Sequence, residues 1–177
     1  DDPLCIAARS AVSLGVTVVA AAGNFGTNLL LKENYGTISS PGNEPSVITV
    51  GATNFKSTVG RADDVVTGFS SRGPTRGGRI VGGARKPDNV IKPDLVAPGN
   101  LIVAAAATRA DAASPTWNKL ATVFAPVLVT PTGITQTYRE TQMYLSGTSV
   151  SAPVVSGAAA VLLQVNPGLT PAMVKAL

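Results

Sequence analysis

A serine at the start of a long uncharged segment suits nucleophilic chemistry. The segment Val150–Gln164 follows Ser149 and has no charged side chain, so it predicts a helix that is apolar on all sides and buried. Pro153 is tolerated only in the first turn, which places the helix N-terminus close to Ser149. Free N–H groups and the positive end of the helix dipole would favour an attacking oxygen and the oxyanion that follows. In the structural alternative, Thr148 or Ser149 is only the N-cap.

An asparagine closes the second segment that could take part in such chemistry. The run Val16–Ala22 is short and apolar and stops at Gly23-Asn24. Short continuous apolar runs are typical of strands that are buried on both faces of a parallel sheet. In an α/β sheet, Asn24 and Ser149 would both lie at the carboxyl edge of the strands, where sites form. A serine and an amide that meet there predict an acyl-transfer site. The alternative makes Asn24 a turn residue that tolerates unusual backbone angles.

The chain contains no histidine. A hydrolase that activates a serine hydroxyl usually has an imidazole beside it, and this chain cannot supply one. Its single cysteine, Cys5, excludes an internal disulfide and a zinc cluster built from cysteines. The apolar neighbours of Cys5 predict a buried thiol.

Helical and extended patterns alternate along the chain, which indicates an α/β architecture. The 45% of hydrophobic residues suffice for one globular core, and no apolar stretch of roughly 18 residues predicts a membrane span. We expect helices at 3–14, after Asp1 and Asp2 and before Gly15, and after the cap Thr170, and strands at 16–22, 46–52, 92–99 and 101–107.

Six basic residues fall between Arg72 and Lys92, within a glycine-rich stretch. They could form a phosphate-binding patch. The stretch has no interleaved aromatic residues and includes Asp88, so we interpret residues 76–89 as a solvated loop and expect no nucleic-acid partner.

Five segments, in order, resemble motifs of the subtilisin-like serine proteases, the subtilases. The segment around Ser149 resembles the nucleophile motif, with Val150 where the family usually has Met. The others include the family's oxyanion-asparagine strand, and together the five cover most of the chain outside 76–90 and 101–142. They are Val18–Asn24, Ile38–Pro41 with Pro45–Ala52, Phe69–Pro74, Lys92–Gly99 and Leu145–Pro153.

The resemblance implies a three-layer α/β fold, with a mostly parallel sheet and helices on both faces. It implies that residues 1–177 are one partial domain, the C-terminal portion of a catalytic domain truncated on its N-terminal side. Residues 108–142 would then be an insertion. We interpret it as a peripheral hairpin, and the alternative is that Trp117 helps to shape the cleft.

The resemblance also implies roles for individual residues. Ser149 would be the nucleophile that forms the acyl-enzyme, and the Asn24 amide would hold the oxyanion together with the Ser149 N–H. Ala21, Ala22 and Gly23 would line a wall of the substrate pocket, Ser39 would lie near its base, and Thr148 would assist the oxyanion site.

The implied function is a serine endopeptidase that cleaves flexible polypeptides. Subtilases place Asp, then His, then Ser along the chain, so both partners of Ser149 would lie upstream and this chain alone would be inactive. A pseudoprotease or binding scaffold of the same fold is the alternative. An esterase is disfavoured because the Gly-x-Ser-x-Gly elbow is missing.

Partners and location are further expectations of the same resemblance. We expect the N-terminal half of the domain as a partner, and self-association of this chain through an open strand edge and exposed apolar faces. Family members commonly bind calcium, but no Asp-rich loop here predicts a calcium site. No membrane partner is expected. The location would be extracellular, with a cytoplasmic one as the alternative.

Overall fold

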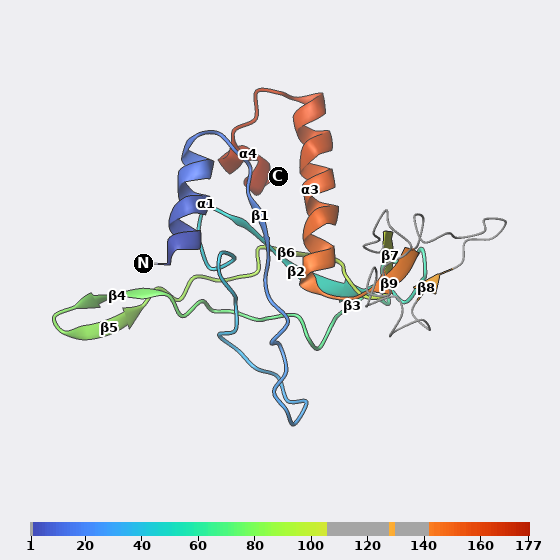
Figure 1. Ribbon diagram of the computed structural model, residues 1–177, viewed down its shortest axis with the longest axis horizontal. Helices are drawn as coiled ribbons and strands as arrows, with labels where there is room; N and C mark the ends of the chain where they lie inside the picture. Colours follow the sequence, from blue (N-terminus) through green and yellow to red (C-terminus); the bar gives the residue numbers. More distant parts are fainter. Residues whose placement is uncertain (1, 106–127, 130–141) are drawn as a thin grey trace, which may run out of the picture. The chain divides into compact units, whose positions relative to one another are not determined.

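The computed structural model describes residues 2–105, 128–129 and 142–177 (Figure 1). The chain divides into two compact units. The first consists of Asp1–Asn100 and Gly147–Leu177, and the second of Leu101–Ser146. Each unit is described by itself.

A four-stranded sheet organises the first unit, with β2 (Ile48–Asn54) at its centre. On one side β2 pairs in parallel with β1 (Val19–Ala21), and on the other with β6 (Leu95–Pro98). The short strand β3 (Val65–Val66) is antiparallel to the end of β2. The strands predicted at 16–22, 46–52 and 92–99 are therefore present, although β1 is shorter than its apolar run.

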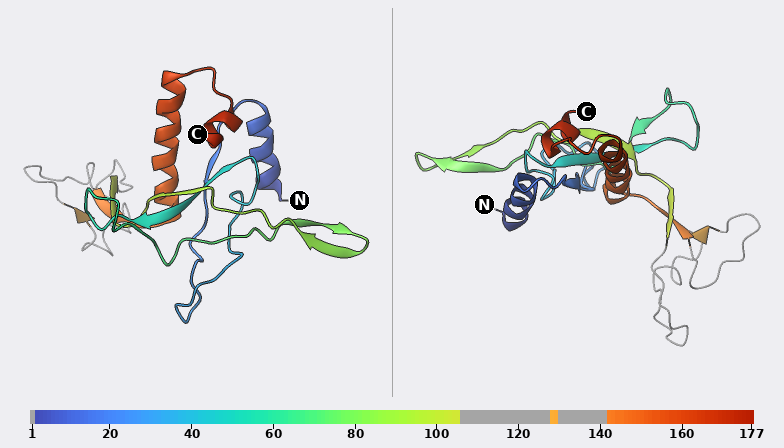
Figure 2. Two further views of the ribbon diagram at one scale, coloured as in Figure 1. Left: turned by 180° about the vertical axis from the view of Figure 1, so that it is seen from behind. Right: turned by 90° about the horizontal axis from the view of Figure 1, so that it is seen from above.

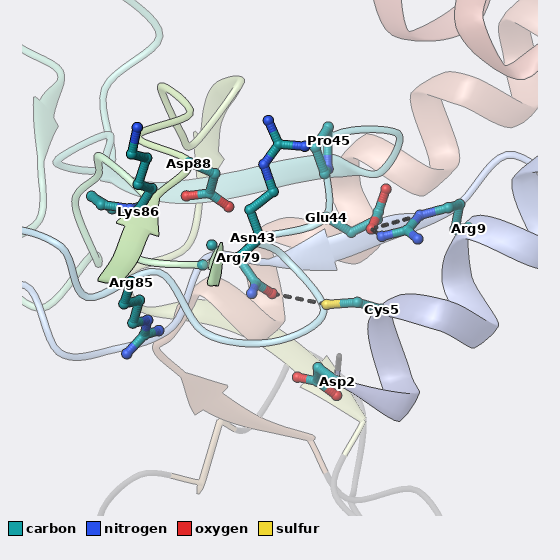
Figure 3. Close-up of a pocket in the computed structure, with 13 residues that line it drawn as sticks. Asp2, Cys5, Arg9, Asn43, Glu44, Pro45, Arg79, Arg85, Lys86 and Asp88 are labelled. Carbon is teal, nitrogen blue, oxygen red and sulfur yellow. Dashed lines mark hydrogen bonds and ion pairs between the residues drawn. The ribbon is translucent and has the colours of Figure 1, made fainter. Parts of the chain in front are cut away.

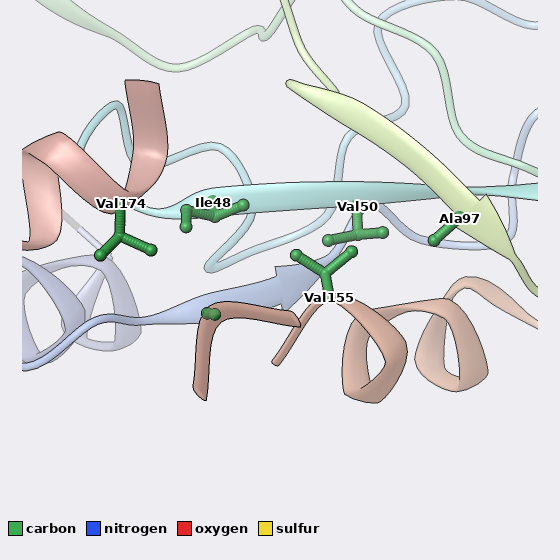
Figure 4. Packing of buried hydrophobic residues seen from close by; sticks show 6 residues of the cluster. Ile48, Val50, Ala97, Val155 and Val174 are labelled. Atoms are coloured by element: carbon green, nitrogen blue, oxygen red, sulfur yellow. The ribbon is translucent and has the colours of Figure 1, made fainter. Parts of the chain in front are cut away.

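Helices cover both faces of this sheet, because consecutive strand residues point to opposite sides. On one face, α1 (Pro3–Ser13) packs Ala8 against Ala20 of β1 and against Val47, which precedes β2. On the other face lie α3 (Thr148–Val165) and α4 (Pro171–Ala176) (Figures 1 and 2). Figure 4 shows their core cluster: Ile48, Val50, Ala97, Val155, Ala159 and Val174.

The predicted helix boundaries are confirmed by their caps. The Asp2 carboxylate accepts the N–H of Leu4 at 2.9 Å at the start of α1, and Gly15 follows its end with a positive φ of 90°. At the start of α4, the Thr170 hydroxyl oxygen accepts the N–H of Met173 at 3.3 Å.

The expectation that the helix after Ser149 is buried on all sides is wrong. Only one side of α3 faces the strands, and its buried residues are Thr148, Ser151, Val155 and Ala159. Val165 is 81% exposed, and Val154 and Val161 are also exposed, because no described element of this unit covers that side. With 18 residues and a mean hydropathy of 1.5, α3 also has the length and composition of a membrane span, contrary to the sequence expectation.

The expectation of a loop at 76–89 is also wrong. Strands β4 (Gly78–Val81) and β5 (Ala84–Pro87) form an antiparallel hairpin whose residues are all exposed. Gly82 and Gly83 have φ values of 60° and 80°, the left-handed pair that a two-residue hairpin turn requires. The adjacent glycines were the signal that a loop interpretation missed.

The second unit contains a three-stranded antiparallel sheet in the order β7-β9-β8. Its strands are β7 (Ile102–Ala105), β8 (Leu128–Val129) and β9 (Gln142–Leu145). The strand predicted at 101–107 is present as β7. Most of the predicted insertion at 108–142, with Trp117, lies outside the described residues, so its form stays a prediction.

Candidate functional site

Asn24 is joined to the start of α3 by two hydrogen bonds. Its side-chain oxygen Oδ1 accepts the backbone N–H of Thr148 at 2.9 Å and the Thr148 Oγ1–H at 3.1 Å. The amide is therefore fixed by its oxygen, and its Nδ2 hydrogens have no acceptor within the described part of the chain. The structure brings the segment after β1 and the start of α3 together.

The first turn of α3 has one N–H group without an acceptor. Gly147 precedes the helix and supplies no side-chain cap. The Thr148 N–H donates to Asn24, and those of Val150 and Ser151 donate to the Gly147 carbonyl at 3.0 and 3.3 Å. In the described ranges, only the Ser149 N–H of these four groups lacks an acceptor. The exposed Ser149 thus combines a free hydroxyl with a free backbone donor.

Gly147 permits the close approach of Asn24 to this turn. Its φ is 152°, a conformation that side chains rarely adopt, and a Cβ there would lie 3.3 Å from Asn24 Nδ2. The free amide nitrogen is therefore adjacent to the residue that leads into Ser149. Two N–H donors next to one hydroxyl are the arrangement that stabilises an oxyanion during acyl transfer.

Thr148 is completely buried, so its side chain cannot contact a substrate. Its hydroxyl accepts the Gly23 N–H at 3.1 Å while it donates to Asn24. Both capacities of the hydroxyl are thus used inside the protein. The sequence predicted that Thr148 assists the oxyanion site, and in the structure Thr148 holds the Asn24 side chain in place.

The predicted pocket residues differ in their access to solvent. Ala21 is half-buried at the end of β1, whereas Ala22 is 0% exposed and its side chain does not line an open wall. The Ser39 N–H donates to the Ala22 carbonyl at 2.9 Å. A Cβ on Gly23, whose φ is 106°, would overlap Ser39 Oγ. The structure therefore gathers Gly23 and Ser39 beside Asn24, and leaves Ala22 behind them in the core.

Sequence reasoning missed Ser71. Its N–H donates to the Gly23 carbonyl at 2.9 Å, and its Oγ accepts the Phe25 N–H at 3.1 Å. The segment Phe69–Pro74 resembles a subtilase motif, but its residue types do not predict a contact with the residues around Asn24. The contact depends on the tertiary fold.

A cluster of charged groups lies at the opposite end of β2, where the strand begins. The Lys92 ammonium donates to Asp94 Oδ2 at 2.6 Å and to the Val47 carbonyl at 2.7 Å. Lys175 of α4 donates to the same two oxygens at 3.2 and 2.7 Å. Burial lowers the pKa of Lys92 to about 8, although the bond to Asp94 opposes this shift. Burial would raise the pKa of Asp94, but its hydrogen bonds, first that from Lys92, hold it below its ordinary value.

The six basic residues of the 72–92 stretch do not form one patch. Lys92 is buried, and Arg72 Nη1 donates to the carbonyl of Gly26 at 2.9 Å. The Lys92 ammonium is thus taken up by the cluster at the start of β2 and is not available to a basic surface patch.

A cavity of about 720 Å³ lies between α1, residues 43–45 and the β4–β5 hairpin (Figure 3). Arg9 and Glu44 form an ion pair of 2.7 Å on its wall, and the buried Cys5 thiol donates to Asn43 Oδ1 at 3.1 Å. None of the residues predicted for catalysis or substrate binding lines this cavity. Within the described ranges, no group of three or more His, Cys, Asp or Glu side chains could hold a metal ion.

Comparison with known proteins places the chain in a family. The profile of the Subtilase family matches residues 3–177, and the chain belongs to this family. Serine protease AprX of Bacillus subtilis (strain 168) is 36% identical over 177 residues, which are 100% of this chain and 32% of AprX. Subtilisin-like protease SBT2.4 of Arabidopsis thaliana is 37% identical over 110 residues, 62% of this chain and 10% of that protein.

Solved structures confirm the subtilisin-like α/β fold. A cold-adapted subtilisin-like serine proteinase matches 97% of this chain with a TM-score of 0.56 and 27% identity. Sphericase matches 97% with a TM-score of 0.60 and 26% identity. The chain covers 40% and 41% of these two structures, and about a third of AprX.

Proposed function

We propose that the protein to which this chain belongs is a serine endopeptidase. In this proposal the chain contributes the nucleophile, Ser149, and the oxyanion-binding amide, Asn24. The observation that carries it is the pair of hydrogen bonds from Thr148 to Asn24 Oδ1. They leave Asn24 Nδ2 free to donate, next to the turn in which the Ser149 N–H has no acceptor among the described residues and the Ser149 hydroxyl is exposed.

The proposed reaction uses these groups in sequence. Ser149 Oγ attacks the carbonyl carbon of a peptide bond and gives up its proton to a base. The tetrahedral oxyanion receives hydrogen bonds from Asn24 Nδ2 and the Ser149 N–H. Its collapse breaks the C–N bond, and the departing amine takes the proton from the base. A water molecule, activated in the same way, then hydrolyses the acyl-enzyme.

The base must come from outside this chain, which has no histidine. In subtilisin the Asp and His precede the Ser along the sequence. We therefore propose that an Asp and a His in a segment that complements this chain complete the site, and that the chain alone is inactive. Flexible polypeptides as substrates and an extracellular location are parts of the same proposal, supported by the family relationship.

A chimera tests this function. In it, the chain replaces the matching third of AprX, which leaves the rest of AprX to supply the base. We expect the chimera to hydrolyse an unfolded polypeptide and the isolated chain not to do so. A Ser149→Ala chimera is the control and should be inactive. A folded chimera without peptidase activity would favour the non-catalytic scaffold instead.

A further inference from the structure

Ser71 bonds to the backbone on both sides of Asn24. Its N–H donates to the carbonyl of Gly23, and its Oγ accepts the N–H of Phe25. These bonds of 2.9 and 3.1 Å fix the residues immediately before and after the asparagine. Ser71 is 1% exposed, so water does not compete for either group. No other described residue bonds to the backbone of both neighbours of Asn24.

The backbone at this point needs such support, because the sheet has already ended. The last bond of this segment to β2 is that of the Ala22 N–H to the Val50 carbonyl, at 2.9 Å. Gly23 then turns the chain with a φ of 106°, and a glycine here restrains the backbone little by itself. A Cβ on Gly23 would lie 2.8 Å from Ser71 Oγ, so the glycine also makes room for the serine.

The segment that carries Ser71 is itself anchored. The Ser70 N–H donates to the Thr67 carbonyl at 3.1 Å. The Arg72 guanidinium donates through Nη1 to the carbonyls of Gly26, Gly68 and Ser70 at 2.9, 3.3 and 3.3 Å. The serine is therefore a rigid support and not a loose loop residue.

We propose that Ser71 is a positioning residue for the oxyanion site. Thr148 fixes the oxygen end of the Asn24 side chain, and Ser71 fixes the backbone from which that side chain projects. A donor contributes to an oxyanion site only when it lies about 2.7–3.1 Å from the developing charge, so loosening of the backbone would lower the rate. This inference rests on the proposed function. The two hydrogen bonds from Ser71 to Gly23 and Phe25, which we call the clamp, can be tested without a measurement of activity.

The adjacent Ser70 provides a matched control. It is equally buried at 1% exposure, and its Oγ also accepts one backbone N–H, that of Ala52 at 3.1 Å. That bond stabilises β2 and does not touch residues 23–25. Ser71→Ala and Ser70→Ala thus remove the same group from neighbouring buried positions, and only the first affects Asn24.

The first test uses hydrogen exchange and NMR on the isotopically labelled 177-residue chain. In Ser71→Ala we expect the Phe25 amide to exchange about tenfold faster and the Asn24 side-chain amide resonance to shift. In Ser70→Ala we expect these signals to stay in place, while the Ala52 amide exchanges faster. Unchanged Phe25 and Asn24 signals in Ser71→Ala, or equal changes in both variants, would overturn the proposal.

Two further measurements keep the test decisive. If Ser71→Ala does not fold, the unsubstituted chain is used: its Phe25 amide should be protected from exchange, and an unprotected amide would contradict the clamp. In the AprX chimera, Ser71→Ala should lower kcat about three- to tenfold at constant KM, the size expected for one hydrogen bond. Ser70→Ala should not change kcat. If the unsubstituted chimera is inactive, the proposed function fails, whereas the exchange experiment still decides on the clamp.

Discussion

Asn24 is held by its oxygen, and this determines what its nitrogen does. An amide has one acceptor end and one donor end, and both side-chain hydrogen bonds of Asn24 within the described residues use the acceptor end. The side chain therefore presents two N–H hydrogens toward the turn that contains Ser149. A carboxylate or an aliphatic side chain at this position could not do so.

The first prediction concerns Asn24 in the AprX chimera. Asn24→Ala removes the donor, and we expect kcat to fall about 10²–10³-fold, the effect known for one oxyanion donor in subtilisin itself. Asn24→Asp should be at least as damaging, because it replaces the donor with a negative charge next to the developing oxyanion. Steady-state kinetics on a peptide substrate measure both effects. A kcat within about twofold of the unsubstituted chimera would exclude Asn24 from the mechanism.

The positions of Ser149 and Asn24 could be predicted from the sequence, because each lies at the end of a helix or strand with a recognisable local pattern. The helix that starts at Ser149 and the strand that stops before Asn24 each have a readable pattern. The roles of Thr148 and Ser71 could not be derived in this way. Thr148 bonds to residues more than a hundred positions away, and Ser71 is one serine among many until the fold brings it to Gly23.

At the scale of elements, α4 is attached to the sheet by charge as well as by apolar packing. Val174 of α4 packs in the core, and Lys175 reaches the Pro45 and Val47 carbonyls at 2.7 Å each. Lys92 and Asp94 complete this junction from the chain just before β6. The buried ammonium of Lys92 makes the junction sensitive to pH.

The pH dependence has a definite sign. Because the pKa of Lys92 is about 8 in the folded chain and 10.5 in the unfolded chain, the unfolded state binds more protons between these values. The free energy of unfolding should therefore rise as the pH increases from 8 to 9, by roughly 1 kcal/mol. Above pH 9 the Cys5 thiol, whose pKa is raised by burial, acts in the opposite direction. Urea unfolding at pH 7, 8 and 9 measures the effect.

Lys92→Met is the control for this prediction. It removes the titrating group but keeps a long apolar side chain, so its stability should not rise between pH 8 and 9. An equal rise in Lys92→Met would assign the effect to another group. A fall in the unsubstituted chain would contradict the argument.

Elements with local signals could be predicted, and elements that depend on their neighbours could not. The caps Asp2 and Thr170 were readable because each bonds within its own first turn. The prediction that α3 is buried on all sides was wrong, because an apolar composition does not show which sides of a helix have neighbours. The β4–β5 hairpin has exposed, charged strands with no apolar alternation, so only the Gly82-Gly83 pair in its turn marks it in the sequence.

At the scale of the molecule, the first unit has open apolar surfaces. Strand β1 pairs with β2 on one side, and no described strand pairs with its other side. The outer side of α3 exposes Val154, Val161 and Val165. Open strand edges and large apolar patches promote association.

We predict that the isolated chain self-associates. Sedimentation velocity should show species larger than the monomer whose fraction grows with protein concentration. Val161→Lys places a charge on the exposed side of α3 without touching the core cluster, and it should shift the distribution toward monomer. A folded chain that stays monomeric at every concentration would contradict this prediction.

The rate at which a fluorophosphonate probe labels Ser149 tests the central claim most directly, because this reaction requires both an activated hydroxyl and an oxyanion site. We predict rapid stoichiometric labelling of Ser149 in the AprX chimera and slow labelling after Asn24→Ala. Labelling of the 177-residue chain alone should be negligible. Rapid labelling of the isolated chain, or a chimera that reacts equally fast with and without Asn24, would contradict the account.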